Sequence, residues 1–237
     1  MIRHFLSSAD ADRASRTMEK FARHDLSQWA LAGGFAVEIH CKRAGREPAI
    51  RPLNDLDFIA PSFDCAPATL ARENFLFRHV HPADPPGKTM LQFFDTQNAV
   101  RIDLFRTVFA VMSRTQRAGR LLLISPEDMT ARSARLLMDL AADLPCAAKY
   151  ARDYLRISGF APISDVETAW IDHRKPSHPA TFREADSLIR RALETRADLL
   201  ITPQYSKNTA KICPRCASGT PFALAEPAAV LALAGYC

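Results

Sequence analysis

The first half of the chain alternates between helix-like and strand-like patterns of apolar residues. Residues 9–28 contain no glycine or proline and have the composition of an amphipathic helix. The apolar run 29–32 then ends at the pair Gly33 and Gly34. This order predicts a short strand, a tight turn and a new helix that begins at the glycines.

Two later segments alternate polar and apolar residues with a period of two, which is typical of half-buried strands. In residues 53–59 the polar face carries Asp55 and Asp57, and in residues 99–105 it carries Asp103. Because side chains at positions i and i+2 of a strand project from the same face, Asp55 and Asp57 are expected to point in one direction.

The remaining strand-like runs cover residues 75–79, 90–95 and 121–124, and a short helix is expected from about residue 69, before the first of them. Residues 96–98 separate the segments 90–95 and 99–105. This spacing predicts a hairpin with a three-residue connection.

After residue 125 the patterns are helical, and helices are expected at 126–142, 145–158 and 181–199. Ser125 precedes a proline and two acidic residues, as at the start of a capped helix. Thr181 and Glu184 have the spacing of a capping box. The change from mixed elements to helices alone predicts a domain boundary between residues 1–125 and residues 126–237.

The composition is that of a globular chain: 237 residues, 48% hydrophobic and 24% charged. A disordered or fibrous protein is therefore not expected. The net charge of +5 is compatible with an anionic substrate but too small for a nucleic-acid packaging protein. No run approaches the roughly 18 apolar residues of a membrane span, and the N-terminus lacks a secretory apolar segment, so no membrane partner and a cytoplasmic location are expected.

Cysteines gather near the C-terminus, where Cys213 and Cys216 form a C-x-x-C knuckle and Cys237 ends the sequence. In a reducing compartment such a knuckle is a candidate half of a structural Zn²⁺ site. His173 or His178 is a candidate fourth ligand. A redox pair or unrelated thiols are the alternatives.

Asp55, Asp57 and Asp103 are the best candidates for chemistry. Carboxylates on one face of adjacent strands can converge on two divalent ions, as in enzymes of phosphoryl transfer. Ligands that are all oxygen favour Mg²⁺ or Mn²⁺ over Zn²⁺. At Gly33 and Gly34, backbone N–H groups at a helix start can approach a triphosphate with no Cβ in the way.

These motifs, in this order, resemble the nucleotidyltransferase superfamily of the DNA polymerase β type. The matching segments are 31–37, with the glycine pair, 54–58, with the Asp-x-Asp motif, and 101–105, with the third aspartate. Within the superfamily the chain looks closest to AbiEii toxin-like minimal nucleotidyltransferases. The resemblance implies an α+β fold, with a mixed sheet flanked by helices in a catalytic domain over residues 1–125. It also implies transfer of a nucleotidyl group from an NTP to an acceptor hydroxyl, with release of pyrophosphate.

Carried over residue by residue, the resemblance implies that Asp55, Asp57 and Asp103 bind the metal ions. Asp103 is also expected to help activate the acceptor hydroxyl. Gly33 and Gly34 would contact the triphosphate. Arg51 stands where relatives often carry a basic residue, and it could neutralise phosphate charge or be a solvated loop residue.

The chain departs from these relatives on the helix after residue 125, where a lysine is usual and this sequence offers Arg132 and Arg135. The next helix carries Lys149 and the pair Arg152–Asp153, which could be site residues or an exposed face with local ion pairs. The expected acceptor is an RNA end, a protein or a small molecule, and an antitoxin partner is possible. The alternative function is a non-catalytic binding or regulatory module with the same fold.

Overall fold

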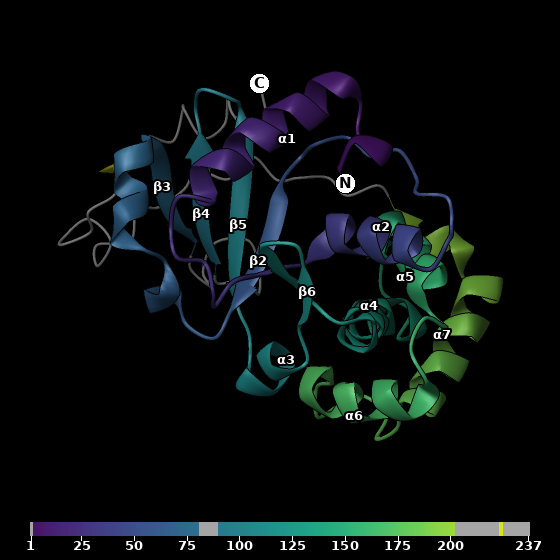
Figure 1. The fold of residues 1–237 in the computed structure, drawn as a ribbon. Coiled ribbons are helices and arrows are strands. Elements are labelled where there is room, and N and C mark those ends of the chain that lie inside the picture. Colours follow the sequence, from purple (N-terminus) through teal and green to yellow (C-terminus); the bar gives the residue numbers. More distant parts are fainter. Residues whose placement is uncertain (1, 81–89, 202–222, 225–237) are drawn as a thin grey trace.

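The computed structural model describes residues 2–80, 90–201 and 223–224, and it has an α+β fold with a mixed sheet flanked by helices (Figure 1). The sheet has the strand order β10-β3-β4-β5-β2-β1-β7-β6. Its strands are β1 (Ala30–Leu31), β2 (Leu56–Ala60), β3 (Phe75–Val80), β4 (Met90–Asp95), β5 (Val100–Arg106), β6 (Gln116–Ala118), β7 (Leu121–Leu123) and β10 (Ala223–Leu224). Two short strands, β8 (Cys146–Ala147) and β9 (Leu200–Ile201), pair separately in parallel.

The helices lie on both sides of the sheet, and α4 to α7 gather at the end of the molecule away from β3 and β4 (Figure 1). Their bounds are α1 (Ser8–Phe21), α2 (Gly33–Arg43), α3 (Phe109–Ser113), α4 (Pro126–Ala141), α5 (Ala148–Ile157), α6 (Ile163–His173) and α7 (Phe182–Thr195). Short 3-10 helices cover Ile2–His4, Phe63–Cys65, Ala68–Glu73 and Ala197–Leu199. In the part of the chain that the structure describes, no helix has the length and apolar character needed to cross a membrane.

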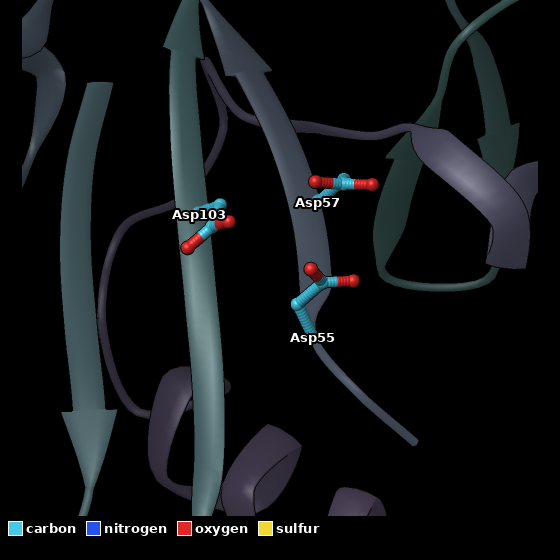
Figure 2. A group of neighbouring side chains, drawn as sticks. All are labelled: Asp55, Asp57 and Asp103. Atoms are coloured by element: carbon cyan, nitrogen blue, oxygen red, sulfur yellow. The ribbon is translucent and has the colours of Figure 1, made fainter. Parts of the chain in front are cut away.

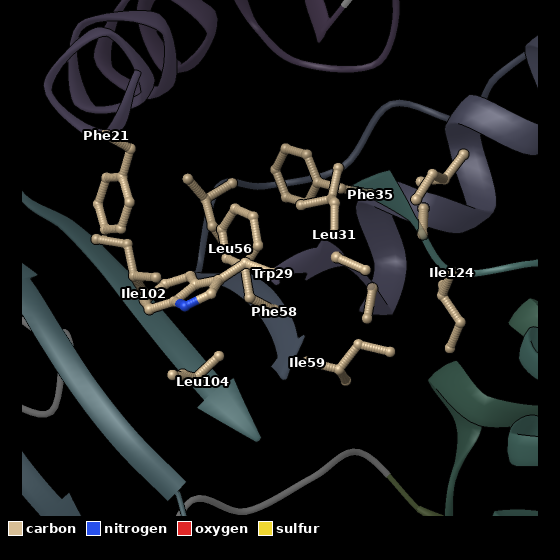
Figure 3. Packing of buried hydrophobic residues seen from close by; sticks show 14 of the residues in the cluster. Phe21, Trp29, Leu31, Phe35, Leu56, Phe58, Ile59, Ile102, Leu104 and Ile124 are labelled. Atoms are coloured by element: carbon tan, nitrogen blue, oxygen red, sulfur yellow. The ribbon is translucent and has the colours of Figure 1, made fainter. Parts of the chain in front are cut away.

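Apolar side chains of the central strands fill a core beneath α1 and α2 (Figure 3). Phe58 of β2 and Leu104 of β5 are completely buried there, against Phe21 of α1 and Trp29. A second apolar cluster fills the centre of the bundle formed by α4 to α7, with Trp170 at its middle. Since side chains alternate along a strand, burial of the apolar face turns the aspartates of β2 and β5 to the opposite face of the sheet.

The central strands confirm the period-two prediction, with two differences at their ends. β2 begins at Leu56, one residue after Asp55, because the chain pairs with β5 only from Leu56 onwards. The hairpin between β4 and β5 has a four-residue connection, 96–99, since Asp95 pairs with Val100 and Ala99 has a positive φ of 51°. The predicted three-residue connection is therefore wrong by one residue.

The first predicted helix, over 9–28, is too long. α1 ends at Phe21, and the chain then turns so that the His24 ring contacts Thr69 Oγ1 at 2.8 Å and Glu73 Oε1 at 3.1 Å. Those two partners lie in the 3-10 helix Ala68–Glu73, which replaces the short α-helix expected there. Tertiary contacts therefore decide where this helix stops.

The later helices confirm the predicted caps, but the region after residue 125 is not made of helices alone. Cys146–Ala147 forms β8 within the helix expected at 145–158, which begins only at Ala148, and one helix is additional. Ser125 Oγ accepts a hydrogen bond from Asp128 N at 3.2 Å, and Thr181 Oγ1 accepts one from Glu184 N at 3.3 Å. The extra helix is α6, which the sequence patterns alone do not predict. Its apolar residues at the spacing i, i+3 and i+4 all point into the bundle: Val166, Ala169 and Trp170.

Candidate metal centre

The three predicted aspartates come together on one face of the sheet (Figure 2). Parallel pairing of β2 and β5 places Asp57 directly opposite Asp103, and Asp55 lies immediately before β2. One carboxylate oxygen from each residue lies within 4.8 Å of the other two. Such a set of hard oxygen donors has the chemistry of a site for Mg²⁺ or Mn²⁺.

A guanidinium group already balances part of this negative charge. Arg101 of β5 forms ion pairs with both Asp55 and Asp103, and its Nε lies 3.2 Å from Asp103 Oδ1. The side-chain amide of Gln92 on β4 also donates to Asp103 Oδ1, at 3.0 Å. Asp55 and Asp103 are therefore both in contact with one guanidinium group, and Asp103 also accepts from a side-chain amide.

Asp57 has a different electrostatic environment. Burial, together with the negative charges of Asp55 and Asp103, raises the pKa of Asp57 to about 7, against the opposing effect of Arg132 and Lys149. This carboxyl group thus titrates near neutral pH, and a divalent cation bound beside it would favour its ionised form. A carboxyl group with a pKa raised to near neutral pH is more typical of a metal centre than of a structural ion pair.

Gly33 is required by the close approach of α2 to Asp57. A Cβ atom at this position would lie 1.9 Å from Asp57 Oδ2, and Gly33 has a positive φ of 63°. The adjacent backbone N–H, of Ala32, donates to the carbonyl of Asp57 at 2.8 Å. The start of α2 is therefore fixed directly against the carboxylates, with space that only glycine leaves open.

Gly34 lies against Arg51, whose Nη1 would be 2.8 Å from a Cβ at this position. Arg51 is not a solvated loop residue: its side chain is 8% exposed and bridges two carboxylates. Its Nε lies 2.6 Å from Glu38 Oε1, and its Nη2 lies 2.6 Å from Asp153 Oδ1. Arg51 therefore holds α2 and α5 together beside the glycines, and its expected contact with a phosphate stays a prediction.

The helical region contributes cations to the same face. Arg132 of α4 lies over the Phe105 ring, with 5.5 Å between the guanidinium carbon and the ring centroid. Lys149 of α5 and Arg132 both lower the pKa of Asp57, so both charges act on the aspartate cluster.

Arg135 is half-buried, and burial lowers its pKa. Arg152 is largely exposed and lies 3.8 Å from Asp153.

Two residues of this site were missed by sequence reasoning, although the pattern contained a signal for each. Arg101 stands two positions before Asp103 and shares the polar face of β5 by the same alternation. Gln92 is directly opposite Asp103 in the hairpin, and it could have been placed there once the register of that hairpin was known.

The predicted zinc ligands Cys213, Cys216 and Cys237 lie outside the described residues. Both candidate fourth ligands have other contacts. His173 Nε2 lies 2.9 Å from Asp128 Oδ1, and the ring of His178 stacks on Trp170 at 6.0 Å. His173 is the last residue of α6.

No family model matches this chain, and no curated protein matches it. Inference about its function therefore depends on the geometry of the aspartate cluster and its surroundings.

Proposed function

We propose that the chain is a nucleotidyltransferase of the DNA polymerase β type, dependent on Mg²⁺ or Mn²⁺, that moves an NMP group from an NTP to an acceptor hydroxyl. The observation that carries this proposal is the convergence of Asp55, Asp57 and Asp103 beside the glycine turn of α2. The order of the motifs along the chain supports it.

The residues present fit divalent ions. Three carboxylates supply hard oxygen donors. Two of them already pair with the Arg101 guanidinium, so the cluster favours a positive charge beside it. Asp55, Asp57 and Asp103 would hold the ions. Bound there, Mg²⁺ would neutralise triphosphate charge and lower the pKa of the acceptor hydroxyl.

The triphosphate would lie at the start of α2. Gly33 and Gly34 leave the backbone open at this helix N-terminus, where N–H groups favour anions. The charges of Arg132 and Lys149, in the helical region, act on the cluster, and both groups would bind phosphate oxygens. These groups position the α-phosphate next to the carboxylates.

In the reaction, the acceptor oxygen forms a new bond to the α-phosphorus as its proton passes to Asp103. The bond from the α-phosphorus to the bridging oxygen of the β-phosphate breaks, and pyrophosphate leaves. The protein contributes mainly positioning and charge neutralisation, which account for most of the catalysis in this class of chemistry. We infer a cytoplasmic location and an acceptor that is an RNA end, a protein or a small molecule.

The test uses each of the four NTPs labelled at the α-phosphate, with Mg²⁺, Mn²⁺ or EDTA, and separate pools of RNA, protein and small-molecule acceptors. Wild type is compared with the double variant D55N/D57N, and D165N serves as the matched control because Asp165 is an exposed aspartate of α6. We expect metal-dependent label transfer and pyrophosphate release by wild type and D165N, and none by D55N/D57N.

A γ-labelled NTP separates this reaction from phosphoryl transfer, because its label should leave in pyrophosphate and never reach the acceptor. If no acceptor is labelled under any condition while the protein still binds NTP, the alternative of a non-catalytic binding module is favoured.

A further inference from the structure

Arg101 is placed between two of the three aspartates. It lies on β5 two positions before Asp103, and its side chain is only 12% exposed. One guanidinium pairs with Asp103 on its own strand and with Asp55 on the segment leading into β2. It is therefore a largely buried cation that joins two segments of the site.

These ion pairs use the same carboxylates that a metal ion would need. The ligand oxygens of Asp55, Asp57 and Asp103 lie within 4.8 Å of one another, and two of these three carboxylates pair with Arg101. Magnesium binds oxygen at about 2.0–2.1 Å and repels a nearby guanidinium. A divalent ion shared by Asp55 and Asp103 would therefore compete with Arg101 for the same two carboxylates.

We propose that Arg101 is a positioning residue that occupies the metal centre as a counter-cation and is exchanged for the divalent ion. In the metal-free chain it offsets the repulsion among the three carboxylates. On metal binding it releases Asp55 and moves away from the ion. This inference deepens the proposed function and rests on its metal centre, and it makes Arg101 a determinant of metal affinity.

A purely structural role for Arg101 gives the opposite expectation. Asp103 is also fixed by Gln92 and by the β4–β5 ladder, but Asp55 lies outside β2, with a side chain 27% exposed. If Arg101 served only to hold Asp55 in place, its removal would disorder a ligand and weaken metal binding. If Arg101 competes with the metal, its removal strengthens metal binding.

The experiment measures Mn²⁺ binding to EDTA-treated, dialysed protein by the electron paramagnetic resonance signal of free Mn²⁺, without nucleotide or acceptor. R101Q is compared with wild type and with R106Q, which removes the same charge from an exposed position of the same strand. We expect the Kd of R101Q for Mn²⁺ to fall by about tenfold or more, because the substitution removes a full positive charge next to the three carboxylates. R106Q should stay within about twofold of wild type, since exposed charges act weakly.

An unchanged or larger Kd for R101Q would overturn the proposal. R101K is a second variant, in case R101Q fails to fold. Its ammonium group keeps the charge but lacks the planar guanidinium group that contacts both carboxylates. Its Kd should lie between those of wild type and R101Q, and a Kd equal to or larger than that of wild type counts against the exchange. Circular dichroism in EDTA and in Mn²⁺ verifies that each variant is folded.

The result of the Mn²⁺-binding experiment can be interpreted independently of the test for nucleotidyl transfer. Tighter Mn²⁺ binding by R101Q supports the exchange even if no acceptor is labelled. Equal binding by wild type and R101Q refutes the exchange even if NMP transfer is observed. If neither protein binds Mn²⁺ at millimolar concentration, both the proposed metal centre and the proposed exchange are refuted.

Discussion

At the scale of single residues, Gly33 carries the strongest steric constraint in the site. We expect G33A to unfold at a lower temperature and to lose metal affinity, because its Cβ would lie 1.9 Å from Asp57 Oδ2 on a backbone with φ of 63°. G45A is the matched control: it has a φ of 70° but no atom within 4 Å of the added Cβ. It should show only the backbone cost of about 1–2 kcal/mol.

Differential scanning fluorimetry with and without Mg²⁺ measures both effects for this pair of glycine variants. Equal destabilisation of G33A and G45A, with the same response to Mg²⁺, would contradict the role given to Gly33.

The raised pKa of Asp57 predicts that the stability of the folded chain falls as pH rises. Burial and the charges of Asp55 and Asp103 raise its pKa from 3.8 to about 7 in the folded chain, so between these values the folded state holds a proton that the unfolded state has lost. The contribution of Asp57 to stability therefore falls as pH rises from about 4 to about 7, and it is constant above that range. In EDTA, D57N should equal wild type near pH 4 and unfold several degrees higher at pH 8.

Thermal unfolding at a series of pH values measures this difference, and D64N, at an exposed aspartate, is the control. A stability difference between D57N and wild type that does not change with pH would exclude the raised pKa.

At the scale of elements, the start of α4 is fixed by one buried carboxylate. Asp128 is fully buried and accepts hydrogen bonds from Arg114, at 2.7 and 2.9 Å, and from Ser125 Oγ, at 2.9 Å. Its contact with His173 links α4 to α6. Burial raises the pKa of Asp128, but the hydrogen bonds and charges of His173 and Arg114 outweigh it, so the net pKa is lowered.

We therefore expect D128N to lose about 1–3 kcal/mol of stability at neutral pH, because Arg114 and His173 lose a buried carboxylate partner and Arg114 keeps only its pair with Asp172. The loss should shrink as pH falls through the acid range below 3.8, where the wild-type carboxylate takes up its proton. Thermal unfolding by circular dichroism checks this, with D139N as the control at an exposed position of the same helix. Equal melting temperatures for D128N and D139N would argue against the network.

The sequence predicts elements well where one face is buried and the period is clear. The alternation around Asp57 and Asp103 is enough to place both on one face of the sheet. The same alternation places Arg101 on the face of Asp103. The end of α1 and the pairing of Arg101 with Asp55 were not predictable in this way, because they depend on contacts between segments far apart in the chain. The helix α6 was missed although Val166, Ala169 and Trp170 have helical spacing, since prolines and histidines follow them closely.

At the scale of the whole molecule, the sheet and the helical region share one buried ion network. Glu38 of α2 is fully buried and receives Arg51 Nε and Arg156 Nη2, each at 2.6 Å, and Asp153 binds the other side of Arg51. Arg156 and Asp153 belong to α5, beyond the predicted boundary at residue 125. Met129 and Ile157 of the helical region also pack into the core of the sheet.

We therefore expect a fragment of residues 1–125 to lack a cooperative unfolding transition, while the full chain unfolds cooperatively. In the full chain, E38Q should lose about 2–4 kcal/mol, because the buried Arg51 and the partly exposed Arg156 lose their common partner and Arg51 keeps only Asp153. E19Q, at an exposed position of α1, is the control. Urea titration of the three full-length proteins and the fragment measures these effects, and a fragment with a sharp transition would show that the two parts are independent.

The pairing of β2 with β5 also has a consequence for how the cell's ionic conditions act on the chain. Asp57 and Asp103 are far apart in sequence and meet only when the strands pair, so an ion bound to both acts as a reversible cross-link of the folded state. By mass action, a ligand at 100 times its Kd adds about 2.7 kcal/mol to stability. The stability of the folded chain would then follow the supply of free magnesium, through the same carboxylates that we propose for its chemistry.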